Sequence, residues 1–328
     1  MDARIDVMQE RVTNRVSSTR ASKSNFIVLK FLILREYWEY KNLYLWLPVV
    51  MSFILFALTC NAGIASLSGL SPEELKDLTQ IIAISKTIET LLIPMLGATS
   101  CVAFYHLMGA LQSDRADRSI LFWKSMPIAD WQVVFSKIVF PIFLGPMMTL
   151  IMGMLAYLFA CAVVCIVASS EGGEGLGQLF SSAAFWQDPW QMTALMPTYI
   201  LWTLPAVGWI CMVSAWTKSR VFPWVLGVPF LLELLLIFGN GYLKLNIDTL
   251  WWTCNLFLRI IGGLLPGMWV VPDSHELMAA GNVNFFSLNY MYERAFHELT
   301  GLRLWLGVLL GCAMVFVAIR QRRYADVI

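Results

Sequence analysis

The sequence predicts an all-α polytopic membrane protein with six transmembrane helices, an N-terminal interfacial helix, and an outer re-entrant or interfacial helical segment. Of its 328 residues, 58% are hydrophobic and only 14% are charged. A soluble domain carries about 25% charged residues, so a soluble fold could not cover this much apolar surface. Several charge-free runs also approach the roughly 20 apolar residues that a helix needs to cross a bilayer.

The N-terminal region is predicted to lie in the cytoplasm. Residues 1–24 are polar, which favours partial disorder. Residues 25–41 combine apolar, basic and aromatic side chains, a composition typical of a helix that lies along the inner interface. We therefore expect residues 1–42 to form a cytoplasmic N-terminus and residues 43–328 to form a single transmembrane domain.

Six apolar runs form the predicted spans. The segment 249–272 is apolar apart from Arg259, but its Gly-Gly and Pro-Gly pairs break helices. We therefore interpret it as a re-entrant or interfacial segment on the outer side and not as a seventh span. The six predicted spans are residues 43–64, 91–111, 138–168, 194–216, 221–243 and 302–319.

The distribution of basic residues predicts the orientation of the chain. With the N-terminus inside, the inner segments hold 17 of the 23 Lys and Arg residues. Inner loops of membrane proteins carry such an excess, so we expect a multi-pass protein of the inner (plasma) membrane with both termini in the cytoplasm. The six basic residues that remain outside are Lys76, Lys86, Lys244, Arg259, Arg294 and Arg303.

Several function classes find little support in the sequence. The net charge of +1 gives no indication of a nucleic-acid partner, and no G-x-x-x-x-G-K-[ST] motif for ATP is present. The three His residues show no H-E-x-x-H spacing, so no catalytic, metal or cofactor residues are predicted. His106, near the inner end of the second span, is interpreted as a satisfied interface residue. The chain is therefore not expected to be an enzyme by itself.

The most informative stretch lies between the second and third spans, at residues 114–137. It reads DRADRSILFWKSMPIADWQVVFSK: a charged cluster, a short amphipathic helix, a Pro break and a second helix start. Aromatic residues and Met are favoured at the centre of protein interfaces, with charged residues at the rim. An ordinary inner loop is the alternative. The candidate docking residues are Arg115, Arg118, Phe122, Trp123, Lys124, Met126 and Pro127.

This stretch is similar to the segment after the second span in ABC-2 type exporter permeases, which commonly carry a run like D-R-S-x-L-F-W-K-S-[LM]-P. The specific match covers residues 114–137, and the layout matches over nearly the whole chain. The resemblance implies that this stretch is the coupling helix that docks into a separate P-loop ATPase subunit, which binds ATP and Mg²⁺. It also implies a second transmembrane subunit, with a homodimer as the expected form.

By this resemblance, the chain is expected to be the permease subunit of an ATP-driven exporter. Its apolar spans favour a hydrophobic or amphipathic substrate. A secondary transporter or channel without an ATPase is the alternative, and that class would show an inverted repeat or several intramembrane charges. Glu233 lies in the middle of the fifth span. It is either a contact in the translocation path or a structural, hydrogen-bonded or protonated carboxyl group.

Overall fold

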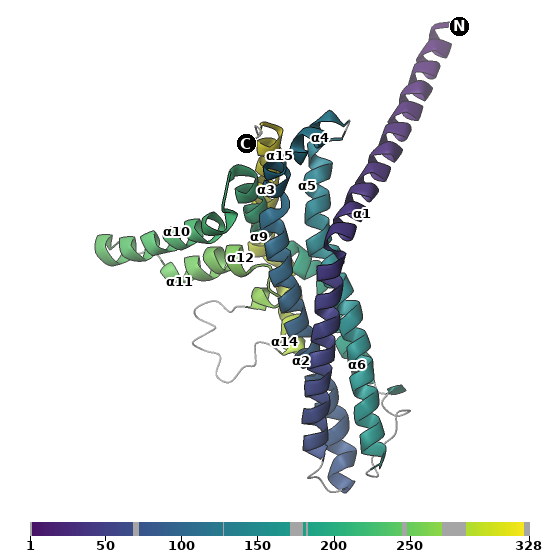
Figure 1. The fold of residues 1–328 in the computed structure, drawn as a ribbon, viewed down its shortest axis with the longest axis vertical. Helices are drawn as coiled ribbons and strands as arrows, with labels where there is room; N and C mark the ends of the chain where they lie inside the picture. Colours follow the sequence, from purple (N-terminus) through teal and green to yellow (C-terminus); the bar gives the residue numbers. More distant parts are fainter. Residues whose placement is uncertain are drawn as a thin grey trace.

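The fold is a bundle of long helices with a helical arm on one side (Figure 1). The structure is a computed structural model that describes residues 2–67, 72–126, 128–170, 180–181, 183–244, 248–270 and 287–324. Within these ranges the regular elements are all helices. Six helical stretches of the same ranges are long and apolar enough to cross a bilayer, which confirms the predicted number of spans. The chain is therefore a multi-pass membrane protein.

The predicted fifth span has the same bounds as its helix, and each of the other five lies within a longer helical stretch. The third span consists of three elements in succession, α5, η1 and α6, and the fourth consists of α8 and α9. The bounds of the spanning elements are α1 Asp2–Leu67, α2 Pro72–Ala110, α5 Asp130–Val139, η1 Phe140–Leu144, α6 Gly145–Ser170, α8 Ala183–Ala194, α9 Met196–Trp216, α10 Val221–Leu243 and α15 Leu302–Tyr324.

The N-terminal region differs from the prediction. One helix, α1, runs from Asp2 to Leu67, so residues 2–24 are helical and the expected interfacial helix at 25–41 continues into the first span. The reason is local, because neither Gly nor Pro occurs in α1 before Pro48. Figure 1 shows the first part of α1 extending away from the bundle.

The third span contains a π-helical turn at η1. Pro141 has no N–H to donate to the carbonyl of Lys137, so the α-helical hydrogen-bond pattern is interrupted here. The turn places the Phe140 ring against two rings of the neighbouring helices. Its centroid lies 5.0 Å from that of Tyr44 on α1 and 5.9 Å from that of His106 on α2. The three helices are therefore in close contact at this level.

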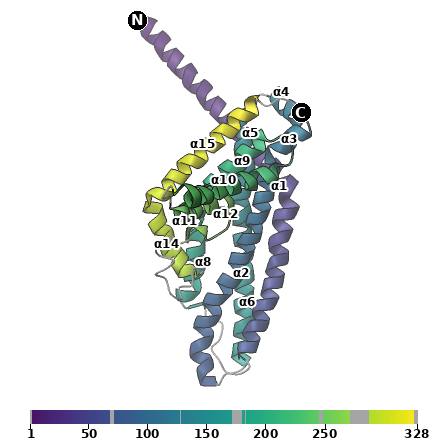
Figure 2. The ribbon, with the colours of Figure 1, turned by 90° about the vertical axis from the view of Figure 1, so that its left-hand side faces the viewer.

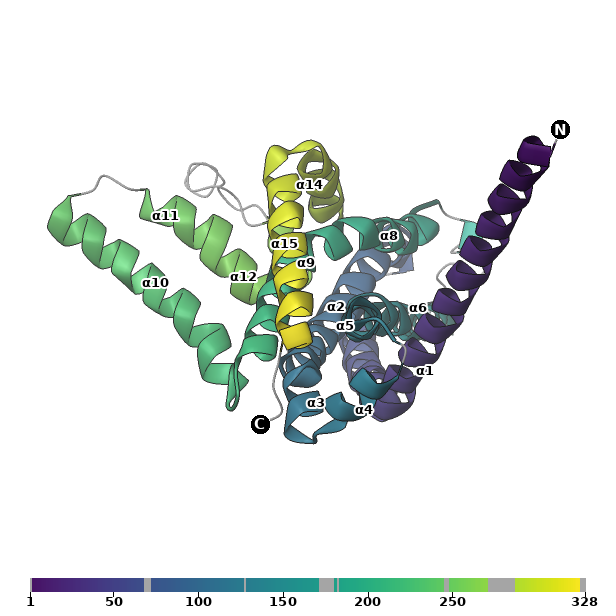
Figure 3. The ribbon, with the colours of Figure 1, turned by 90° about the horizontal axis from the view of Figure 1, so that it is seen from above.

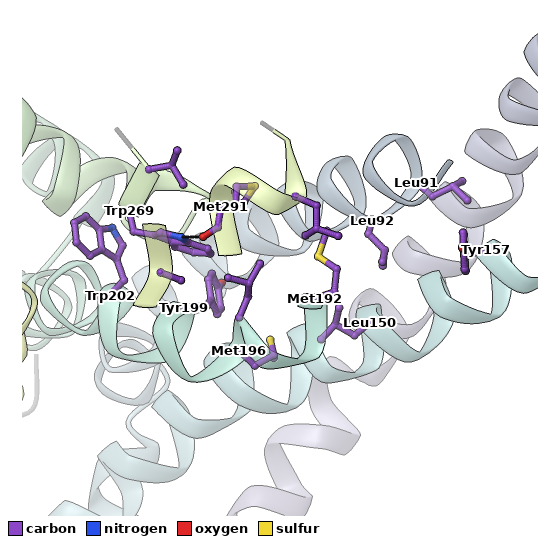
Figure 4. Close-up of a cluster of buried hydrophobic side chains, with 14 of the residues drawn as sticks. Leu91, Leu92, Leu150, Tyr157, Met192, Met196, Tyr199, Trp202, Trp269 and Met291 are labelled. Atoms are coloured by element: carbon purple, nitrogen blue, oxygen red, sulfur yellow. Dashed lines mark hydrogen bonds between the residues drawn. The ribbon is translucent and has the colours of Figure 1, made fainter. Parts of the chain in front are cut away.

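An apolar cluster of buried side chains joins several helices of the bundle (Figure 4). It joins Leu91 of α2, Tyr157 of α6 and Trp202 of α9, all of them fully buried. Trp269 of the 3₁₀ turn η3 (Met268–Val270) closes it, and its indole Nε1 donates a hydrogen bond to the carbonyl of Met291 in α14 (Leu288–Thr300). The segment before the last span is thereby packed onto the bundle.

Helices α9 and α15 cross at two glycines. A Cβ atom on Gly208 would lie 2.6 Å from the carbonyl oxygen of Gly311, and one on Gly311 would lie 2.6 Å from the carbonyl group of Leu204. Small residues let membrane helices approach this closely. Figure 2 shows α15 running from α14 to the end of the molecule where α3 and α4 lie.

The fifth span forms the arm. Helix α10 leaves the bundle, and α11 (Thr249–Trp252), η2 (Thr253–Phe257) and α12 (Leu258–Gly262) return beside it (Figure 3). The buried residues of α10 are confined to the first three turns of that helix. The expected helical character of 249–272 is confirmed up to Gly262. Its depth in the bilayer stays a prediction, and residues 271–272 lie outside the described ranges.

Candidate functional site between the second and third spans

The segment between the second and third spans folds into two short helices and the start of a third. These are α3 (Gln112–Ala116), α4 (Ser119–Ser125) and the first turn of α5. Arg118 joins α3 to α4 with a positive φ of 57°, and its backbone N–H bonds the carbonyl of Arg115 at 3.1 Å. The chain therefore reverses sharply here, and α4 lies at one end of the bundle (Figure 1).

Helix α4 presents an apolar tip. Phe122 is 55% exposed and its neighbour Leu121 is 54% exposed, while Ile120 on the opposite side is buried in the bundle. Arg118 is exposed beside them. Leu121 was not among the predicted anchors, because sequence alone does not say which side of a seven-residue helix faces the bundle. The tip thus combines two large apolar side chains with one guanidinium group.

Two other predicted anchors lie deeper. Trp123 is half-buried, and the Arg35 guanidinium carbon of α1 lies 4.6 Å from the centroid of its ring. Met126 is also half-buried. Trp123 therefore attaches α4 to α1 by a cation–π contact as well as supporting the ring of Phe122, whose centroid lies 5.4 Å away. The Lys124 side chain and Pro127 lie outside the described parts of the structure.

Arg115 does not belong to an exposed rim, which corrects the prediction. Its side chain is buried, and its Nη2 donates to the carbonyl oxygens of Ser214 and Thr217, each at 2.6 Å. These carbonyls belong to the C-terminal end of α9, where helical carbonyls lack partners within the helix. A guanidinium group is a favourable partner there, because it complements the negative end of the helix dipole. Arg115 therefore fastens α3 to α9.

A buried ion network lies beneath the segment. Lys137 Nζ of α5 lies 3.5 Å from Glu36 Oε1 of α1 and 3.3 Å from Asp114 Oδ1 of α3. Arg322 Nη1 of α15 lies 2.8 Å from Asp114 Oδ2. His106 Nε2 of α2 lies 3.6 Å from Glu36 Oε2. All five side chains are almost completely buried.

Charges of opposite sign are paired within the network. Its two carboxylates face one ammonium and one guanidinium group, so each charge that leaves water finds an opposite charge. Arg322 has a second, partly exposed partner, Asp130, at 3.6 Å. The sequence did not reveal the network because Asp114 and Arg322 are separated by 208 positions. The only sequence signal for the network was a charged residue at the end of a span. Such residues occur at many span ends, so the signal does not identify a pair.

Glu233 occupies a different region, the arm. The Thr253 hydroxyl of η2 donates a hydrogen bond to Glu233 Oε1, and the Glu233 side chain is half-buried. This contact matches the structural alternative, in which the carboxyl group is hydrogen-bonded to a neighbouring helix. A role of Glu233 in a translocation path stays a prediction.

The base of the arm is held by Arg259. Its guanidinium carbon lies 4.2 Å from the centroid of the Trp202 ring, and its Nη1 and Nη2 donate to the carbonyls of Arg303 and Leu304 at 2.7 and 3.2 Å. A Cβ on Gly307 would collide with the Arg259 guanidinium group, so glycine is needed where Arg259 crosses α15.

Within the described residues, no three His, Cys, Asp or Glu side chains are placed to hold a metal ion. Comparisons of the chain with models of protein families, with curated proteins and with solved structures found no match.

Proposed function

We propose that the chain is the transmembrane permease subunit of an ATP-driven exporter of the ABC-2 type. The observation that supports this best is the tip of α4, where Phe122 and Leu121 are more than half exposed on a segment fastened to the bundle. An exposed pair of large apolar side chains on a rigid base is the arrangement that a protein partner recognises. The proposed partner is a P-loop ATPase subunit that docks on Phe122, Leu121 and Arg118.

The rest of the assembly follows from the same proposal. ATP and Mg²⁺ would bind to the ATPase subunit, and a second copy of the chain would complete the membrane part as a homodimer. The proposed location is the plasma membrane, with α4 in the cytoplasm. Helix α15 ends at the same side, because Arg322 in its last turn pairs with Asp114 of α3. The proposed cargo is hydrophobic or amphipathic.

Affinity purification tests the docking. The tagged chain is purified in mild detergent with ATP and vanadate, and the co-purifying proteins are identified by mass spectrometry. We expect a stoichiometric P-loop ATPase with the natural chain and with Phe159→Ala, a control that truncates an exposed Phe in the third span. Phe122→Ala and Arg118→Glu should lose it. Recovery of equal ATPase with Phe122→Ala would contradict the docking surface.

A proton-coupled secondary transporter is the second candidate. It is favoured by one observation, the burial of Glu36, His106 and Lys137 together, because such carriers place several ionisable groups within their helices. The chain alone in liposomes would then carry protons under a membrane potential, as measured with an internal pH dye, and His106→Gln would reduce the rate. No ATPase would co-purify in that case.

A further inference from the structure

We infer that Asp114, Lys137 and Arg322 are positioning residues that make the docking segment move as one body with α1 and α15. This inference deepens the proposed function, since it names the helices that receive a push on α4. If only the covalent chain transmitted the push, it would reach α2 and α5, which directly flank the segment. The ion pairs across the bundle transmit it to α1 and α15 as well.

Asp114 is the centre of this connection. Its two carboxylate oxygens bind different cations, Oδ1 the ammonium group of Lys137 and Oδ2 the guanidinium group of Arg322. Lys137 passes the connection to Glu36 of α1, and Arg322 carries it to the last turn of α15. A displacement of α3 must therefore either carry α1 and α15 with it or separate buried opposite charges.

A second set of contacts joins the same segment to α9. Besides the Arg115 contacts, the Ser214 hydroxyl accepts hydrogen bonds from the N–H groups of Leu111 and Gln112 at 3.3 and 3.2 Å. The same hydroxyl donates to the carbonyl of Met108 at 2.8 Å. The junction of α2 and α3 is thus held by neutral hydrogen bonds that do not depend on Arg322. Removing Arg322 should release the segment from α15 while this contact with α9 remains.

Amide hydrogen exchange of the purified chain in lipid nanodiscs tests the inference. Arg322→Gln leaves the sequence of the docking segment unchanged, so any effect there must pass through the pairing. We expect the amides of α3 and α4 to exchange about tenfold faster in Arg322→Gln. The matched control is Arg323→Gln, an exposed neighbour on the same turn, which should leave the exchange unchanged. Glu36→Gln should act like Arg322→Gln from the other side.

A double-mutant cycle shows whether pairing is the cause. The double variant Asp114→Asn with Arg322→Gln removes both members of the pair and leaves Lys137 with Glu36, so its α3 and α4 amides should exchange no faster than those of Asp114→Asn alone. Unchanged exchange of α3 and α4 in Arg322→Gln would overturn the inference. If Arg322→Gln does not purify as a single species, the exchange of the α3 and α4 amides is measured in Arg322→Lys instead. This variant keeps the charge but loses the guanidinium fork, so we expect faster exchange there too.

The measurement separates this inference from the proposed function. It uses the chain without an ATPase, so an unaltered exchange rate would overturn the role of Arg322 and leave the docking of an ATPase standing. Failure to purify an ATPase would overturn the docking and leave the exchange result valid.

Discussion

Two regions differ in what surrounds their side chains: the arm, and the end of the bundle that carries α3 and α4, called the α4 end. At the α4 end, charged groups of α1, α3, α5 and α15 are buried and paired with one another. In the arm, most of the large apolar side chains of α10 beyond its first turns are exposed, including Leu235 at 67%. The α4 end is therefore specified by contacts within the protein, whereas the arm is specified by its apolar composition, which suits lipid.

The difference predicts where substitutions act. Buried charges tolerate the loss of a partner poorly, and close helix crossings tolerate extra volume poorly. An apolar helix with few protein contacts has few paired charges and few close crossings, so substitutions there should cost less stability. The following substitutions probe the α4 end, the bundle and the arm.

Removing Lys137 should have the largest effect. Lys137→Met leaves Glu36 and Asp114 without their shared cation, and we expect a loss of about 3–5 kcal/mol in the free energy of unfolding. The measurement is an SDS titration of the protein in micelles. Lys218→Met, at an exposed lysine, is the control and should change stability little. A loss below about 1 kcal/mol for Lys137→Met would mean that water solvates this site.

Filling the crossing of α9 and α15 should have an intermediate effect. In Gly311→Ala the added methyl group meets the Leu204 carbonyl of α9, and α9 and α15 must move apart. We expect a loss of about 1–3 kcal/mol in the same titration. Gly227→Ala in the arm is the control, since nothing lies within 4 Å of its Cβ position. There Ala should stabilise the helix slightly. Equal losses of stability at both sites would contradict the view that the bundle is closely packed and the arm is not.

The polar pair of the arm should contribute less. Glu233→Leu removes the carboxyl group that accepts from Thr253, and we expect a change below about 1 kcal/mol, as for other hydrogen bonds between membrane helices. A double-mutant cycle with Thr253→Val measures the pair itself. A loss above about 2 kcal/mol with Glu233→Leu alone would indicate that Glu233 has an additional buried partner.

The smallest effect on stability is expected at the tip of α4. Phe122→Ala truncates an exposed side chain, so the free energy of unfolding should change by less than about 0.5 kcal/mol. The same variant should lose the ATPase in the purification described above. A large loss of stability would show instead that Phe122 is part of the bundle, and the loss of ATPase would no longer report on docking.

The sequence by itself determined the class of protein, the six spans and the segment between the second and third of them. These features depend on local composition, because some 20 apolar residues cross a bilayer wherever they occur. Docking anchors were predicted from residue type alone, which did not reveal that Leu121 is as exposed as Phe122. The same reasoning mistook Arg115 for a rim residue and expected partial disorder in residues 1–24, of which residues 2–24 belong to α1.

Only the tertiary structure decided how the charged residues at the span ends are used. Arg115 and Arg118 are three positions apart, yet one is buried against α9 and the other is exposed. Lys137 and Arg322, which the sequence only counted as inner charges, meet on one carboxylate. The physical reason is that apolar character is a property of a stretch of chain, whereas the pairing of a charge depends on which helices pack beside it.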